Sequence, residues 1–113
     1  NCHIGAMSHI TACNGILIGK NLLTGTNVII TDNAHGRFDM DELNMHPEKR
    51  SLVSKGKVII GDNVWLGNNV CIMPNVSIGD GVIVGANSVV TKDIPSYSVA
   101  VGAPAIVVKQ IRK

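Results

Sequence analysis

The sequence predicts a mainly β fold in which short strands coil around a narrow aliphatic core. Hydrophobic residues make up 45% of the 113 residues but aromatic residues only 3%, so Ile, Val, Leu and Ala must fill the interior. From residue 58 onward an aliphatic residue recurs every six positions, usually with a second one two positions earlier. A short period kept this long predicts a solenoid, in which each coil is buried by its neighbours. The recurring residues are Ile60, Leu66, Ile72, Ile78, Val84 and Val90, preceded by Val58, Val64, Val70, Val76, Val82 and Ser88.

Each six-residue unit divides into a three-residue strand and a three-residue turn. Side chains alternate along a strand, so the first and third should point inward and the middle one outward. The last turn residue is always Asn, Gly or Asp, which tolerate a left-handed backbone. Three units close one triangular coil, so residues about 18 apart should stack. The left-handed positions are Asn63, Asn69, Asn75, Gly81, Asn87 and Asp93.

The same phase extends through the first third of the chain. It assigns the first inward position to Ile4, Ile10, Ile16, Leu22, Val28 and Ala34, and the second to Ala6, Ala12, Ile18, Thr24 and Ile30. It assigns the left-handed turn position to Gly15, Asn21, Asn27 and Asn33, where His9 fits poorly. An ordinary small β-sandwich would not keep this phase. The pattern resembles the left-handed parallel β-helix, the hexapeptide-repeat solenoid.

One segment and one end depart from the repeat. Residues 36–57 hold nine of the eighteen charged residues (ten Lys and Arg plus eight Asp and Glu), so they should form a loop extruded from one corner. Loops of this length in compact domains are usually functional, and the alternative is a tolerated insertion. Residues 103–113 should form a short tail, either a basic helix begun at Pro104 or an edge strand. Residues 1–113 are thus interpreted as a single domain.

Composition excludes several functions. A net charge of +2 is too small to indicate nucleic acid or a membrane surface as partner. No apolar run reaches the ~18 residues of a membrane span. Cys2, Cys13 and Cys71 lack the spacing of a disulfide framework or zinc ribbon, which favours a reducing cytoplasm.

Longer motifs point to a family. The strings ITDNAHG, KVIIGDNVWLGNNVCIMPNVSIGDGVIVGANSVVTKDIP and VAVGAPA, with the charged loop, resemble the hexapeptide-repeat O-acetyltransferases. The nearest members are the lipopolysaccharide O-antigen and capsular-sugar acetyltransferases, followed by the maltose and galactoside acetyltransferases. The resemblance covers residues 16–110 and implies transfer of an acetyl group from acetyl-CoA to a sugar or glycan hydroxyl, with no metal. The chain begins with Asn1 in the middle of a repeat, so we interpret it as the later part of a longer protein or as a chain whose first end is covered by something else. The family's N-terminal helical portion has no counterpart here.

The resemblance implies that His35 is the general base. With Ala34 expected inward, His35 should point outward at the rim, where an acceptor could dock. An imidazole that titrates near neutrality can remove a hydroxyl proton as the oxygen attacks the thioester. His3, His9 and His46 are interpreted as structural or solvent-facing.

The resemblance also implies the donor site. Trp65 is the outward residue of its strand, on a wall otherwise free of aromatic side chains. Turn backbone groups could bind the pantetheine amides, and lysines could bind the phosphates. The implied donor-binding residues are Trp65, Asn68, Ala86, Thr91, Lys92 and Lys109. Ile106 replaces a second basic residue of galactoside-type enzymes, while Gly5 and Cys13 replace their acceptor-binding Asn and Asp, which favours an O-antigen-type acceptor.

Alternatives remain beside this interpretation. An N-acetyltransferase of an amino sugar or antibiotic would use the same His35 and donor groove. A non-catalytic solenoid would explain the repeat but not the loop or His35. Zinc chemistry of the carbonic anhydrase type needs three His ligands, and the spacing of His35 and His46 does not supply them. A covalent route through Cys71 would need an activated thiol.

The expected assembly is a homotrimer. A single prism presents flat walls, whereas ligand sites need concavity. Three prisms around a threefold axis would form three equivalent grooves where walls meet. We therefore expect each active site between two subunits, with the extruded loop closing it beside His35.

Overall fold

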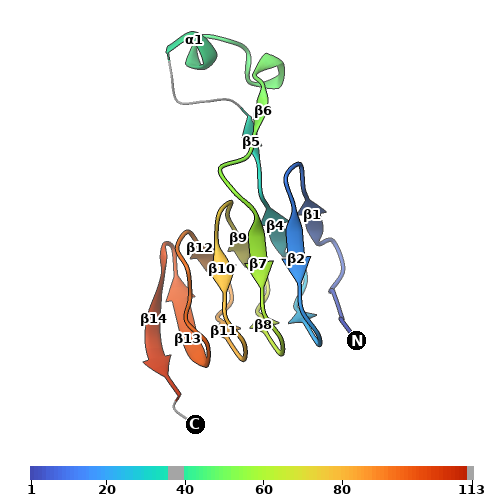
Figure 1. Ribbon diagram of the computed structural model, residues 1–113, viewed down its shortest axis with the longest axis vertical. Coiled ribbons are helices and arrows are strands. Elements are labelled where there is room, and N and C mark those ends of the chain that lie inside the picture. Colours follow the sequence, from blue (N-terminus) through green and yellow to red (C-terminus); the bar gives the residue numbers. More distant parts are fainter. Residues whose placement is uncertain (36–39, 112–113) are drawn as a thin grey trace.

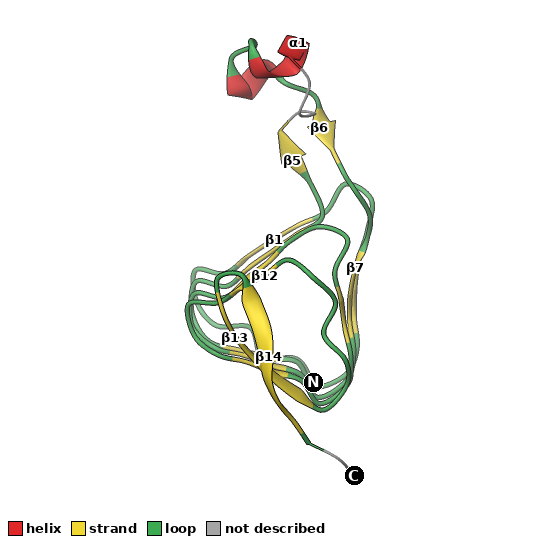
Figure 2. Cartoon of the chain, turned by 90° about the vertical axis from the view of Figure 1, so that its left-hand side faces the viewer, coloured by secondary structure: helices red, strands yellow, loops and turns green. Residues whose placement is uncertain are grey.

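The computed structural model describes residues 1–35 and 40–111, except for the side chains of His35 and Leu52, and forms a left-handed parallel β-helix. Seen along its axis, the chain encloses a triangle (Figure 2). Wall 1 consists of β1 (His9–Thr11), β4 (Ile29–Thr31), β9 (Cys71–Ile72) and β12 (Val89–Val90). Wall 2 consists of β2 (Ile16–Ile18), β7 (Val58–Ile60) and β10 (Ser77–Ile78). Wall 3 consists of β3 (Leu23–Thr24), β8 (Trp65–Leu66), β11 (Ile83–Val84), β13 (Ser98–Gly102) and β14 (Ala105–Gln110).

The predicted inward and outward alternation is confirmed in the second half of the chain. In β7, Val58 and Ile60 are buried while Ile59 between them is 44% exposed. Parallel pairing joins residues 18 apart, as between Trp65 and Ile83, so inward side chains stack in continuous rows. Each fully buried aliphatic side chain contributes about 1.5–3 kcal/mol. The rows contain Leu22, Val28, Ile30, Val58, Ile60, Val64, Leu66, Val70, Ile72, Val76, Ile78, Val82, Val84 and Val90.

The left-handed corner positions are confirmed for most of the expected residues. Asparagine suits them for a second reason, because stacked carboxamides bond to each other along the axis. Asn27 Nδ2 donates to Asn69 Oδ1 at 3.0 Å, and Asn69 Nδ2 donates to Asn87 Oδ1 at 3.0 Å. Positive φ is found at Asn21, Asn27, Asn63, Asn69, Asn75, Gly81 and Asn87, but not at Gly15, Asn33 or Asp93, where the prediction is wrong.

The predicted phase is also wrong in the first coil. His9 pairs with Ile29, 20 positions away, so this coil is two residues longer than the regular 18. Ile10 consequently stacks on Ile30 in the second inward position, not the first. Met7, with φ 59°, takes the left-handed corner equivalent to Asn27. Ala6 and Ala12, expected inward, are exposed, and Ile4 and Ile10 remain partly exposed at this open end.

Changes in coil length occur at the corner between walls 1 and 2, here called the variable corner. From His9 in β1 to Leu17 in β2 the chain advances eight positions, against six from Cys71 to Ser77. The extruded loop follows β4 at the same corner. After β12 the chain is two residues shorter than regular, because Ile94 pairs with Ile78, 16 positions away. Asp93 therefore leaves the left-handed position, and Tyr97, with φ 57°, takes the next one.

The loop leaves the prism as a hairpin, as predicted for residues 36–57 in so far as they are described. β5 (Ala34–His35) and β6 (Leu52–Val53) pair antiparallel and carry α1 (Met40–Leu43) and η1 (Pro47–Lys49) away from the coils (Figure 1). Ala34 is exposed, contrary to prediction, because the chain has already left the wall. At the tip Ser51 Oγ donates to the buried Glu42 carboxylate, and Arg50 Nη2 donates to Leu43 O at 3.1 Å.

The tail adopts the edge-strand alternative. β14 pairs antiparallel with β13 across a turn containing a cis Ala103–Pro104 peptide. Within the described part of the chain, no helix has the length and apolar character needed to cross a membrane.

Candidate functional site

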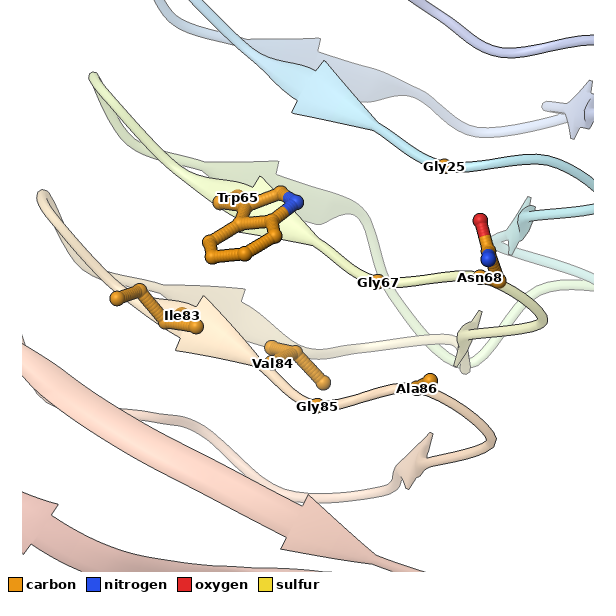
Figure 3. Close-up of a pocket in the computed structure, with 8 residues that line it drawn as sticks. All are labelled: Gly25, Trp65, Gly67, Asn68, Ile83, Val84, Gly85 and Ala86. Atoms are coloured by element: carbon orange, nitrogen blue, oxygen red, sulfur yellow. The ribbon is translucent and has the colours of Figure 1, made fainter.

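A groove of about 320 Å³ crosses wall 3 beside its corner with wall 1. Trp65 forms one side, with its side chain 52% exposed as predicted for an outward residue. Its strand pairs with β11, which places the indole beside Ile83 (Figure 3). The groove is lined by Gly25, Trp65, Gly67, Asn68, Ile83, Val84, Gly85 and Ala86, so three of the predicted donor-binding residues lie together.

Three glycines, each placed directly after one of three neighbouring strands of wall 3, account for the shape of the groove. Gly25, Gly67 and Gly85 each come directly after β3, β8 and β11 and stack along the axis. A Cβ at Gly67 would lie 2.8 Å from Ala86 N, and one at Gly25 would collide with Asn68 Oδ1. Since neighbouring backbone excludes side chains at Gly25 and Gly67, backbone lines this part of the floor of the groove. Such a floor can offer peptide groups to an extended ligand.

Asn68 links two coils at the end of this groove. Its Oδ1 accepts a hydrogen bond from Thr26 N at 2.9 Å, and its backbone carbonyl accepts from Asn87 N at 2.9 Å. The first bond holds the side chain, which points toward the coil of Gly25 in Figure 3. The residue can therefore hold the lip of the groove in place before any ligand arrives.

The other predicted donor-binding residues do not line this groove. Lys109 lies on β14, opposite Val99 of β13, so it shares wall 3 with the groove but sits nearer the C-terminal end. Thr91 and Lys92 follow β12 at the variable corner, across wall 1 from Trp65. All three residues are exposed. Within one chain, the predicted donor-binding residues therefore lie in two places, on wall 3 with its groove and at the variable corner.

The predicted base belongs to the variable corner. His35 ends β5 and pairs with Leu52 of β6, so its backbone stands at the base of the extruded hairpin. Its side chain lies outside the described residues. His35 therefore shares a corner with Thr91 and Lys92, and wall 1 separates it from the Trp65 groove.

Asp32 is a feature of this corner that the sequence patterns did not indicate. The carboxylate is fully buried and accepts hydrogen bonds from Cys13 N, Asn14 N and Gly15 N at 2.6–2.8 Å. Asn33 Nδ2 donates a fourth at 2.9 Å. Burial alone would raise the pKa of Asp32, but the hydrogen bonds outweigh it and hold that pKa well below its usual range. In the sequence Asp32 looked only like a turn residue.

Neither Cys71 nor Cys13 provides an activated nucleophile. Burial raises the pKa of the Cys71 thiol, whose Sγ lies 3.4 Å from Met73 Sδ. Loss of hydration and the neighbouring Asp32 charge raise the pKa of Cys13. Both shifts disfavour the thiolate, which is the reactive form. Among residues 1–35 and 40–111, no group of three or more His, Cys, Asp or Glu could hold a metal ion.

Comparison with known proteins agrees with the repeat. The family described as bacterial transferase hexapeptide (six repeats) matches residues 57–92, and the hexapeptide repeat of succinyl-transferase matches residues 1–32. A protein of Escherichia coli strain K12 named for O-acetyl transfer in lipopolysaccharide biosynthesis, WbbJ, is 41% identical over 114 residues. That match covers 97% of this chain and 58% of WbbJ, so the chain spans little more than half of this relative.

Comparison with solved structures points to the same family. A maltose O-acetyltransferase from Clostridium difficile 630 is 32% identical with a TM-score of 0.76, covering 100% of this chain and 70% of that one. A galactoside acetyltransferase in complex with coenzyme A is 25% identical with a TM-score of 0.68, covering 95% of this chain and 66% of that one. On its repeat, its fold and these similarities, the chain belongs to the hexapeptide-repeat acetyltransferase family.

Proposed function

We propose that this chain is the β-helix domain of an O-acetyltransferase that uses acetyl-CoA to acetylate a hydroxyl of a sugar or glycan. The observation that carries the proposal is the glycine-floored groove beside Trp65, which suits an extended pantetheine chain. The similarity to a galactoside acetyltransferase that binds coenzyme A supports the choice of donor. The similarities to proteins named as O-acetyltransferases support the choice of acceptor. Use of acetyl-CoA favours a cytoplasmic location.

The proposed reaction is a direct transfer without a metal. The acceptor hydroxyl attacks the thioester carbonyl carbon while His35 removes its proton. The new C–O bond gives a tetrahedral intermediate, which collapses as the C–S bond breaks. The sulfur of coenzyme A leaves with the proton that His35 returns. No acyl-Cys intermediate is needed, in keeping with the raised pKa of the Cys71 thiol.

The proposed assembly is a homotrimer, because one chain separates the parts of the site. Trp65, Asn68 and Ala86 line the groove, whereas Thr91 and Lys92 lie at the variable corner with His35. In a cyclic trimer the variable corner of one subunit can face the groove of the next. Such packing supplies the concavity that a single flat wall lacks.

A coenzyme A release assay tests the function. Purified protein with acetyl-CoA is offered nucleotide sugars, free sugars, glycans and amines, and thiol release is followed alongside product mass. We expect release with hydroxyl acceptors and a product that hydroxylamine cleaves, since an ester is labile to it and an amide is not. A product resistant to hydroxylamine would favour N-acetylation, and absence of transfer to every acceptor would contradict the proposal.

Substitution of the lysines is expected to weaken binding of the acetyl-CoA donor and to leave the chemical step unchanged. Lys92→Ala and Lys109→Ala should each raise the KM for acetyl-CoA up to about tenfold. A charge-assisted hydrogen bond contributes about 1.5–3 kcal/mol, and exposure of these side chains to solvent keeps the contribution at the lower end of that range. kcat should change little. Initial rates over a range of acetyl-CoA concentrations measure both parameters.

Two comparisons make the lysine experiment specific. Lys20→Ala removes an exposed lysine at the corner between walls 2 and 3 and should leave the KM unchanged. Acetyl-dephospho-CoA lacks the 3′-phosphate, so it should reduce or abolish the effect of whichever lysine contacts that group. If both substitutions leave the KM unchanged, the donor does not follow this path.

A further inference from the structure

The buried carboxylate of Asp32 lies where the extruded hairpin joins the prism, and the proposed reaction gives it no role. Its Oδ1 accepts from Cys13 N at 2.8 Å and from Asn33 Nδ2 at 2.9 Å. Its Oδ2 accepts from Asn14 N at 2.7 Å and from Gly15 N at 2.6 Å. Both oxygens therefore face two donors each, and three of the four donors belong to the lengthened turn of the first coil.

Neighbouring bonds tie the outgoing side of the hairpin to the end of β1 in the same coil. Asp32 N and Asn33 Nδ2 both donate to Thr11 O at 3.3 Å. Thr31 Oγ1 accepts from Asn33 N at 3.2 Å and so closes residues 31–33 on themselves. The segment immediately before Ala34 and His35 is thereby held to the first coil.

The returning side of the hairpin is held as well. Ser54 Oγ accepts from Gly56 N at 3.2 Å, and Gly56 O accepts from Asn75 N in the following coil at 3.2 Å. The first coil and a later coil therefore brace the hairpin from opposite sides, with Asp32 at the centre of the first brace.

We propose that Asp32 is a positioning residue that fixes the base of the hairpin and thereby places His35 against the acceptor hydroxyl. The proposal rests on the proposed function of His35, three residues further along the chain. Only a carboxylate meets the requirement at this position, because both of its oxygens accept. An amide would direct its NH₂ group at donors, and the turn or the hairpin would have to shift.

The matched substitutions are Asp32→Asn and Asp80→Asn. At Asp80, Oδ1 accepts from Asp62 N at 2.7 Å at the corner between walls 2 and 3, and an amide oxygen can accept the same bond. Asp32→Asn should lower kcat about 10- to 100-fold, since a displacement of about 1 Å of a reacting group has effects of that size. The KM for acetyl-CoA and the dissociation constant for coenzyme A should stay within about twofold, because none of the hydrogen-bond partners of Asp32 is a residue assigned to donor binding. Asp80→Asn should retain kcat.

Asp32→Glu separates positioning from simple stability. It keeps both accepting oxygens but moves them by one methylene, so it should recover most of the melting temperature lost in Asp32→Asn while kcat stays low. It also serves if Asp32→Asn does not fold. A kcat that follows the melting temperature through both variants, or is unchanged in them, would overturn the proposal.

A spectroscopic measurement keeps this proposal distinct from the proposed function. The imidazole ¹⁵N signals of His35 should shift in Asp32→Glu and stay unchanged in Asp80→Asn. If the wild-type protein transferred no acetyl group, the proposed function would fail, and the imidazole signals would still test the positional link. Unchanged His35 signals in Asp32→Glu would overturn the link, whatever the activity.

Discussion

Replacing His35 with Ala is expected to lower kcat for acetyl transfer about 10²- to 10⁴-fold, the usual contribution of a general base. Without the imidazole, the hydroxyl must attack the thioester while it still carries its proton. The dissociation constant for coenzyme A should stay nearly unchanged, because His35 is proposed to act on the acceptor proton and is not among the residues that line the Trp65 groove. Coenzyme A binding by calorimetry and steady-state rates with a saturating acceptor measure the two effects separately.

His46→Ala is the matched control for this substitution. His46 is exposed at the tip of the hairpin, where its Nδ1 accepts from Glu48 N at 3.2 Å and caps η1. It lies in the same loop but is expected to leave kcat within about twofold, as for most surface positions. If His35→Ala retained turnover, or lost coenzyme A binding to the same extent as turnover, His35 would not be the base.

Mixing two inactive variants is expected to restore activity if each site joins two subunits. Trp65→Ala damages the groove and leaves the variable corner intact, whereas His35→Ala does the opposite. In randomly mixed trimers about one quarter of the sites combine an intact groove with an intact His35 corner. Activity should therefore recover to about a quarter of the wild-type value after the subunits are unfolded and refolded together.

The control for mixing is a double variant. Trp65→Ala combined with His35→Ala in one chain, mixed with either single variant, cannot form a site with both parts intact. Size-exclusion chromatography with light scattering gives the mass of the assembly in parallel. A fully active monomer would contradict the trimer, and an active trimer in which mixing restores nothing would place both parts of the site in one subunit.

The repeat made most of the fold predictable from sequence. Inward Val64 and Leu66, outward Trp65 and left-handed Asn69 follow from one short pattern, because each coil is the template of the next. The same logic failed in the first coil. A six-residue phase contains no information about two extra residues in a turn, so Ile10 was assigned to the wrong inward position.

The candidate site was less predictable, because it depends on which corners stack. Trp65, Asn68 and Ala86 resemble donor-binding residues and do lie together. Lys92 resembles them equally well, yet it comes after β12 of wall 1 and lies at the variable corner. Asp32 was missed because its partners are the backbone N–H groups of a turn 17–19 residues earlier, and no side-chain pattern records such groups.

Because of the variable corner, the rise of this β-helix per coil does not depend on the number of residues in the coil. β2 and β7 remain in register although 42 positions separate their paired residues, and β7 and β10 remain in register at 18. Residues can therefore be added at the variable corner without bending the axis of the prism or changing its other two corners. An architecture of this kind can change the surface presented to an acceptor at this corner, while wall 3, which carries the Trp65 groove, keeps the spacing between its strands.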